Sequence, residues 1–236
     1  MRLSVVVVPF ALALRARTGP PASVPRDAQL GPGTSWQIPP ADGHYGAHVE
    51  LRADEVVRGL SRHLRTIPEA HRKPNDGGLP EKHGAYAWWM SPGAIAGVRG
   101  PSHPTEQFEL LYVGIAPKDA RSQTTLRSRV RDQHLGGNIG SSTFRQSLAA
   151  LVFEDHGWTT RWSGSRTQLI PEHNRALSDW QRANLRLGWV ERPRPWTVEG
   201  RVIALMQPPL NLAGNTSHPL YGRLKALRAK LREGTE

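Results

Sequence analysis

Two short apolar runs, each with one tyrosine close to a glycine, place the strongest limit on how this chain can fold. The first surrounds Tyr86 and the second surrounds Tyr112. Both runs are rich in residues that favour β-structure and are bounded by polar or Pro/Gly segments. They predict strands at about Gly84–Met90 and Phe108–Ile115. Tyr86 and Trp88 lie two positions apart and therefore share one face of the predicted sheet.

Helical patterns surround these strands. Apolar residues recur with helical spacing, and cap or breaker residues mark the ends. The pattern predicts helices at about Val49–Leu64, Gln123–His134, Ser142–Leu151, Pro171–Leu185, Trp196–Met206 and Pro219–Arg232, and a short strand at Arg186–Val190. Thr66–Lys82 is expected to be a connection, and Phe153–Ile170 a mixed loop with a possible strand.

The front of the chain differs from the rest. Residues 1–47 are rich in Pro, Gly and Ala without periodicity and are expected to form a disordered tail, followed by one domain over 48–236. The apolar run within Met1–Leu14 is too short to span a membrane, so no membrane partner is expected. It has a small-x-small site at Ala11-Leu12-Ala13 that suits a signal peptide, and a mis-assigned start codon explains it equally well.

Charge and composition narrow the function classes. The net charge is +11, from 31 Lys+Arg against 20 Asp+Glu, and arginine predominates. Arginine suits phosphate, which favours a nucleic-acid partner, although ordinary solubilising charge is the alternative. The chain has no cysteine, which excludes disulfides, zinc fingers and thiol chemistry. A metal would need oxygen or imidazole ligands, which favours a hard ion such as magnesium.

Hydrolysis of a phosphodiester requires a cation for the developing charge, a base for the water and a positive group on the phosphate. The chain offers Glu199, two strand tyrosines and Arg129 on the helix that follows them. In this order the residues resemble the GIY-YIG nuclease superfamily. Gly84-Ala85-Tyr86 matches its first motif, Tyr112-Val113-Gly114 its second, Arg129 its helical arginine, and Glu199 its carboxylate, followed by Asn211 after Pro208-Pro209.

The resemblance implies an α+β fold with a small central antiparallel sheet of about three strands, flanked by helices, and a DNA endonuclease activity, with RNA as the alternative substrate. It implies one Mg²⁺ or Mn²⁺ ion bound by Glu199. Tyr86 would activate or orient the attacking water, Tyr112 would position the phosphate or the same water, and Arg129 would hold the phosphate oxygens. Asn211 would tie the helix of Glu199 to the sheet.

The chain also departs from the family pattern. Segments 91–107 and 135–195 are longer than expected, and the C-terminal helix is basic. Many members carry a histidine or tyrosine four residues after the arginine, whereas this chain has Gln133 there and His134 one place later. One α-helical residue is about 100° of rotation, which predicts that His134 points away from the site. Nucleic-acid contacts are expected from a polar set on or near this helix, Arg127, Arg131, His134 and Lys118.

Three hypotheses follow from the sequence. The first is a metal-dependent DNA endonuclease acting in the cytoplasm, at the nucleoid. The second is a catalytically inactive nucleic-acid-binding module on the same scaffold, and Gln133 motivates it. The third is a basic structural protein in which the motifs are coincidental, and it predicts that Tyr86 and Glu199 lie far apart. The oligomeric state and the target sequence are left open.

Overall fold

The computed structural model describes residues 53–156 and 159–233. The predicted tail over 1–47 and the first residues of the predicted helix Val49–Leu64 lie outside the described residues. The described part of that helix covers residues 53–60 and precedes a turn.

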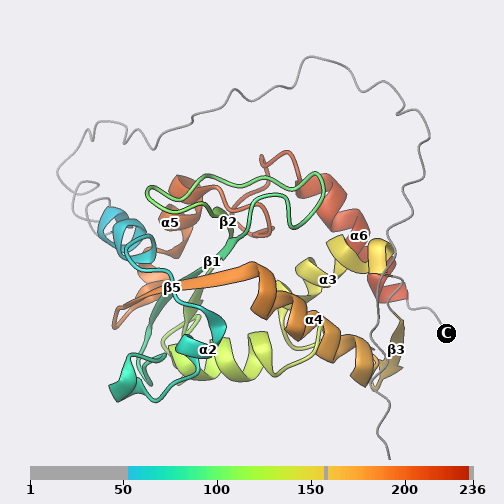
Figure 1. Cartoon of the computed structure of the whole chain (residues 1–236), viewed down its shortest axis with the longest axis horizontal. Coiled ribbons are helices and arrows are strands. Elements are labelled where there is room, and N and C mark those ends of the chain that lie inside the picture. Colours follow the sequence, from blue (N-terminus) through green and yellow to red (C-terminus); the bar gives the residue numbers. More distant parts are fainter. Residues whose placement is uncertain (1–52, 157–158, 234–236) are drawn as a thin grey trace, which may run out of the picture. The chain divides into compact units, whose positions relative to one another are not determined.

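A three-stranded antiparallel sheet forms the centre of the described fold (Figure 1). Its strands are β1 (Gly84–Met90), β2 (Glu109–Ala116) and β5 (Leu185–Glu191), in the order β2-β1-β5. The predicted fold class is therefore confirmed. The first strand has the predicted bounds, and the other two differ from the predicted ends by one residue at each end.

Helices and one hairpin complete the fold. They are α2 (Ile67–Ala70), η1 (Pro74–Asp76), η2 (Ser128–Leu135), α3 (Thr143–His156), the hairpin β3 (Thr160–Ser163) with β4 (Arg166–Leu169), α4 (Pro171–Asn184), η3 (Pro195–Thr197), α5 (Glu199–Met206) and α6 (Tyr221–Glu233). None of the helices in the described ranges has the length and apolar character that a membrane crossing requires.

Local capping explains two differences from the predicted helix boundaries. α2 was predicted as a connection, but Thr66 and Glu69 form a reciprocal capping box that starts a helical turn. The helix that carries Arg129 begins at residue 126 rather than at Gln123. Here Thr125 and Ser128 exchange hydrogen bonds between their backbone N–H groups and side-chain oxygens, at 3.0 and 3.2 Å, and fix the later start.

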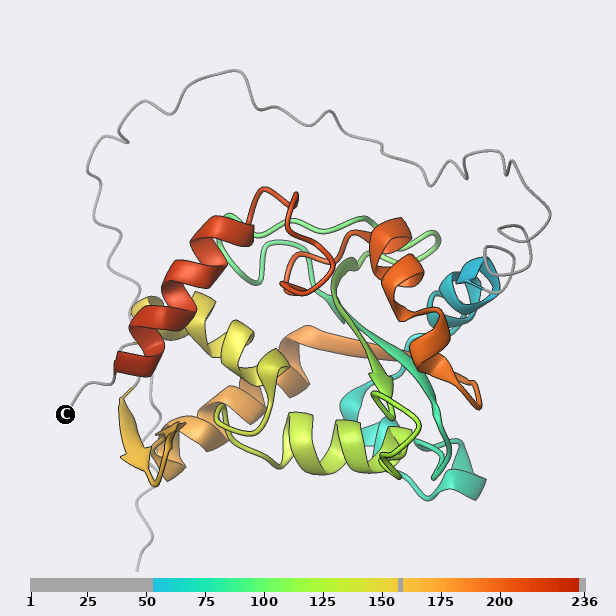
Figure 2. The same cartoon turned by 180° about the vertical axis from the view of Figure 1, so that it is seen from behind.

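Both faces of the sheet are covered, on one side by η2 and α3 and on the other by the 53–60 helix and α5 (Figures 1 and 2). On the first face Trp88 stacks on Phe144 of α3, with ring centroids 4.8 Å apart. On the second face the Trp89 indole N–H donates to the Leu60 carbonyl oxygen over 3.3 Å. All seven β1 residues are buried as a result, and the strand reads as a continuous apolar run.

The two enlarged segments have different structures. Residues 91–107 fold back as an irregular loop and place Ile95 and Val98 in the core. Residues 135–195 contain α3, the β3–β4 hairpin, α4 and the whole of β5. The second segment therefore supplies one strand of the central sheet as well as two helices that pack beside the tyrosine-bearing face.

Candidate active site

The register between β1 and β2 explains why a glycine follows the second tyrosine. Tyr86 lies directly opposite Gly114, and Trp88 lies opposite Tyr112. A Cβ atom at Gly114 would be 2.3 Å from the Tyr86 hydroxyl oxygen, so only glycine leaves room for this phenol across the strand pair. Tyr86 and Tyr112 become diagonal neighbours on one face, with ring centroids 6.4 Å apart.

We expect Gly114→Ala to displace the Tyr86 ring and to lower stability by about 1–3 kcal/mol, because the ring is fully buried and the added methyl group overpacks it. Chemical denaturation followed by fluorescence measures the change. Gly222→Ala is the matched control, since no atom lies within 4 Å of a Cβ at that helical position. A Gly114→Ala protein as stable as the Gly222→Ala protein would contradict this explanation of the motif.

His134 lies under the Tyr86 phenol, which overturns the prediction that it points away. Its Nε2 is 2.6 Å from the Tyr86 hydroxyl oxygen, and its Nδ1 is 2.7 Å from the Ser142 hydroxyl oxygen. The reason is the form of η2, which is a π-helix, closed by a bond of 2.8 Å from the Gly136 N–H to the Arg131 carbonyl oxygen. A π-turn holds more residues than an α-turn, so each residue rotates by less than 100°. The wider turn therefore brings His134 to the side of the helix that the family histidine would occupy one position earlier in an α-helix.

Gln133 occupies the place expected for the family histidine and has a different partner. Its side-chain oxygen accepts a hydrogen bond from the Arg129 guanidinium, one helical turn earlier. Burial alone would lower the pKa of Arg129, but Tyr86, Tyr112 and Glu199 act together to raise it. The guanidinium is thus held among the two phenols and the carboxylate.

Glu199 is the first residue of α5 and is half-buried. Burial raises the pKa of its carboxyl group, and the positive charge of Arg129 opposes that rise. The same carboxylate raises the pKa of Tyr86 and of Tyr112, although burial is the main cause for both. Two tyrosines, one arginine and one glutamate from β1, β2, η2 and α5 therefore converge. The coincidence hypothesis, which required Tyr86 and Glu199 to lie far apart, is wrong.

The aromatic groups at this site are neutral at pH 7. Burial raises the pKa of Tyr86 well above its usual range, and Tyr112 adds to the rise while Arg129 opposes it. Burial also lowers the pKa of His134 well below its usual value, and the charges of Arg129 and Arg145 lower it further. A neutral phenol therefore faces a neutral imidazole in the resting protein, because transfer of the proton alone would create a buried phenolate and imidazolium.

Asn211 joins the segment after α5 to the edge of the sheet, where we predicted such a tie. Its side-chain oxygen accepts from the Val113 N–H over 2.9 Å, and its side-chain NH₂ donates to the Val113 carbonyl oxygen over 2.8 Å. Val113 lies between Tyr112 and Gly114, so the amide caps β2 within the second tyrosine motif. Asn211 is buried and acts on the strand rather than on a substrate.

Arg145 of α3 is a residue that the sequence reasoning missed. The side chain is fully buried and donates to the carbonyl oxygens of His134 and Leu135 and to the side chains of Ser178, Gln181 and Asn174, over distances of 2.6–3.2 Å. Burial lowers its pKa to about 10, so it stays charged at pH 7. The guanidinium binds the last carbonyls of η2 and fixes the helix end that carries His134. Nothing in the local sequence separates it from an exposed arginine.

The four residues expected to contact nucleic acid divide into two groups. Lys118 and Arg131 are exposed, with 82% and 51% of their side-chain surfaces accessible. Arg127 is a correction, because only 15% of its side chain is accessible and its guanidinium donates to the carbonyl oxygens of Arg72 and Leu79. His134 is also a correction, because it is buried and its two ring nitrogens already contact the hydroxyl oxygens of Tyr86 and Ser142.

The donor set fits a weakly held hard cation rather than a protein-built metal cage. Within residues 53–156 and 159–233, no cluster of three or more His, Asp or Glu side chains could enclose an ion. Glu199 is the acidic group that influences both tyrosines. Magnesium is commonly bound by one or two carboxylates, with water and substrate phosphate as the remaining ligands, and a single half-buried carboxylate suits that mode.

Comparison with known proteins agrees with this geometry. The model of the GIY-YIG catalytic domain matches residues 84–230, a range that begins at β1 and includes the convergent groups and Asn211. Searches of curated proteins and of solved structures gave no match. Since the matched range covers more than half of the chain and contains both tyrosine motifs in register, the chain belongs to the GIY-YIG catalytic domain family.

Proposed function

We propose that the protein is a metal-dependent endonuclease that hydrolyses phosphodiester bonds of DNA in the cytoplasm, at the nucleoid. The observation that carries the proposal is the convergence of Tyr86, Tyr112, Arg129 and Glu199 beside a buried His134. Packing alone does not require a carboxylate and a guanidinium to meet over two phenols. Family membership supports a nuclease, and the excess of positive charge supports a polyanionic substrate.

Each group has a role that its chemistry supports. Arg129 would hold non-bridging phosphate oxygens through its planar fork, with Gln133 orienting the guanidinium. Glu199 would bind Mg²⁺ or Mn²⁺, which when bound would stabilise negative charge on the phosphate and the leaving oxygen. Tyr112 would position the phosphate or the attacking water. Tyr112 is partly exposed, in contrast to Tyr86.

Tyr86 would act as a relay for the water proton. Its pKa is too high for a resting phenolate, so it can take a proton from water only as it passes its own proton to His134. The Nε2 atom, 2.6 Å away, would receive that proton, and Nδ1–H would donate to the Ser142 hydroxyl oxygen. The Ser142 hydroxyl oxygen also accepts a hydrogen bond of 3.1 Å from the backbone N–H of Arg145, which fixes the position of the hydroxyl group. Arg129 and Arg145 destabilise the imidazolium and favour return of the proton.

The observation that favoured an inactive binding module has another explanation in this structure. It rested on Gln133 in place of the family histidine, and His134 supplies an imidazole to Tyr86 through the π-turn. We therefore favour a complete catalytic set over a scaffold that kept only binding.

The test is cleavage of supercoiled plasmid, branched DNA and structured RNA, each with Mg²⁺ or Mn²⁺. We expect metal-dependent nicking of DNA by the wild type and loss of nicking in Glu199→Ala. Equal nicking by the two proteins would remove Glu199 from the mechanism. Salt-dependent binding with no cleavage of any substrate under either metal would favour the binding module instead.

A further inference from the structure

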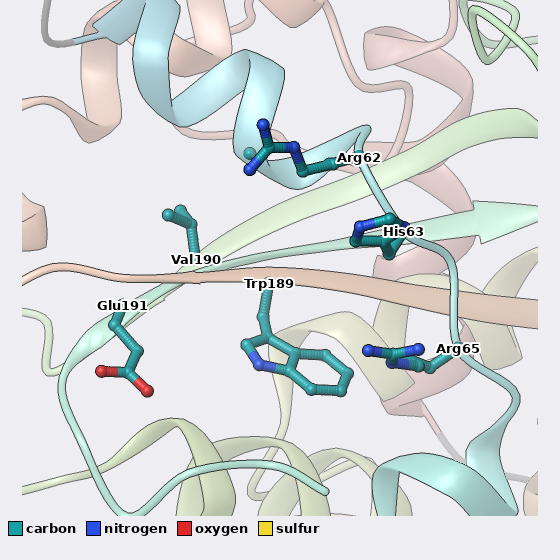
Figure 3. A pocket seen from close by; sticks show the side chains of 7 residues that line it. Arg62, His63, Arg65, Trp189, Val190 and Glu191 are labelled. Atoms are coloured by element: carbon teal, nitrogen blue, oxygen red, sulfur yellow. The ribbon is translucent and has the colours of Figure 1, made fainter. Parts of the chain in front are cut away.

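A pocket with a volume of about 300 Å³ lies along the free edge of β5, away from the edge at which Asn211 caps β2. Figure 3 shows its lining. The side chains come from β5 and from the segment that follows the 53–60 helix, namely Arg62, His63, Arg65, Trp189, Val190 and Glu191. We call this the edge pocket. It is at the small end of the range for ligand sites, which suits a phosphate with part of one nucleotide.

The backbone beside the edge pocket is open. Arg65 and Leu187 exchange two backbone hydrogen bonds of 2.9 Å, so Leu187 turns its N–H and C=O away from β1. Alternate residues of a strand turn these groups to the same side, so Trp189 and Glu191 also present theirs outward. Beyond the Arg65 bridge, the described residues provide no backbone partner for these groups.

The edge pocket carries a net positive charge, which favours an anionic ligand. The Arg65 guanidinium lies over the Trp189 ring at 5.9 Å from its centroid, and the Glu69 carboxylate interacts with it electrostatically without forming an ion pair. Neither Arg62 nor Arg65 forms an ion pair with another described residue. The acidic residue of the lining, Glu191, is already bound by Lys82 over 2.8 Å. Two guanidinium groups therefore remain for a ligand.

The edge pocket is also in register with the proposed catalytic tyrosine. Trp189 lies directly opposite Tyr86 on the neighbouring strand, so the two side chains leave the same face of the sheet. Adjacent strands are about 4.8 Å apart. A nucleic-acid strand extends over many phosphates, so one held at Tyr86 and Arg129 has further phosphates available to this edge. The bare strand edge could instead accept a peptide strand, but two arginines that form no ion pair with a described residue favour phosphate.

We propose that the edge pocket binds a backbone phosphate of the substrate strand, away from the scissile one, through Arg62 and Arg65. This proposal rests on the proposed function for the identity of its ligand. It assigns part of the target binding to the segment that follows the 53–60 helix, at the edge of β5, rather than to Arg127 or His134.

The test measures binding rather than cleavage, so it does not depend on catalysis. Arg62→Ala/Arg65→Ala is compared with Arg161→Ala/Arg175→Ala, which removes the same charge from two exposed positions on β3 and α4. Both pairs are made in a Glu199→Gln background. Fluorescence anisotropy with single-stranded and duplex oligonucleotides, at 50–200 mM salt, gives the affinity and its salt dependence.

We expect the pocket pair to weaken oligonucleotide binding by about 10-fold or more and to reduce the slope of log K against log salt by about 1–2, while the control pair leaves the slope unchanged. Equal slopes in the two pairs would overturn the proposal. Saturable binding of inorganic phosphate that is lost in the pocket pair, with unchanged oligonucleotide slopes, would also overturn it and assign the pocket to a free phosphate. If the slope falls as expected but the wild type cleaves nothing, the pocket stands and the proposed nuclease activity fails.

Discussion

Glu199→Gln is expected to lower metal-dependent DNA cleavage by about 10³-fold or more, while the protein stays folded. The amide keeps the size of the side chain but removes the negative charge that would hold the metal ion. Because the amide and the carboxylate have nearly the same size, we expect Arg129 and both tyrosines to keep their positions. Single-turnover cleavage rates with Mg²⁺ and with Mn²⁺ measure the effect.

The stability of the same variant gives a second, independent outcome. Burial raises the folded-state pKa of Glu199 above its ordinary value, so folding favours the protonated carboxyl group. The stability that the protein gains from protonation of Glu199 is fully present below the unfolded-state pKa. It is lost as the pH rises through the folded-state pKa. Without metal, Glu199→Gln should therefore melt at a higher temperature than the wild type at pH 7, and the difference should disappear near pH 4. A variant that is less stable at pH 7 would contradict the buried-carboxylate account.

Arg145→Met is expected to lower the free energy of unfolding by about 4 kcal/mol, which corresponds to a fall in Tm of about 10 °C. The substitution keeps an unbranched chain of similar length but leaves several buried acceptors without a donor, including the carbonyl oxygens of His134 and Leu135. Thermal melting at pH 7 measures the change. Arg175→Met, at an exposed position on α4, is the control and should stay within about 0.5 kcal/mol of the wild type.

Activity separates the positioning role of Arg145 from its role in stability. Arg145→Lys keeps a charge and up to three donors, so it should recover part of the stability. The ammonium group of lysine cannot donate to all the partners that the planar guanidinium binds. We therefore expect the end of η2 that carries His134 to shift. At a temperature where the Lys variant is folded, kcat should fall at least about 10-fold with little change in KM. A Lys variant with wild-type kcat would show that Arg145 stabilises the fold without positioning His134.

The sequence predicted the tyrosine strands well because their signals are local. The β1 run has the predicted bounds, and Tyr86 and Trp88 share a face as expected. The resemblance to the family identified Arg129, Glu199 and Asn211 as site residues. The structure brings them to one end of the sheet or to its edge. These groups could be found because they follow the two tyrosine motifs in the order of the family pattern, although Asn211 itself lies in an irregular segment after α5.

Non-local features could not be predicted in the same way. At the end of the π-helix η2, Arg145 and Gln181 donate to the His134 carbonyl oxygen from helices that follow later in the chain. An α-helical wheel therefore gave the wrong direction for His134. Arg127 looked like an exposed rival of Arg129, but its carbonyl partners lie more than 40 positions earlier in the chain. Tertiary contacts decided both outcomes.

The convergence of the catalytic groups around one ion is the central claim, and anomalous diffraction from Mn²⁺ tests it most directly. Crystals of Tyr86→Phe would be grown with an uncleaved oligonucleotide and Mn²⁺. We predict one strong anomalous peak about 2.0–2.2 Å from a Glu199 carboxylate oxygen, with Arg129 on the same phosphate and the ring at position 86 beside it. A peak bound by other residues, or a phosphate held away from both Glu199 and Arg129, would contradict the proposed active site.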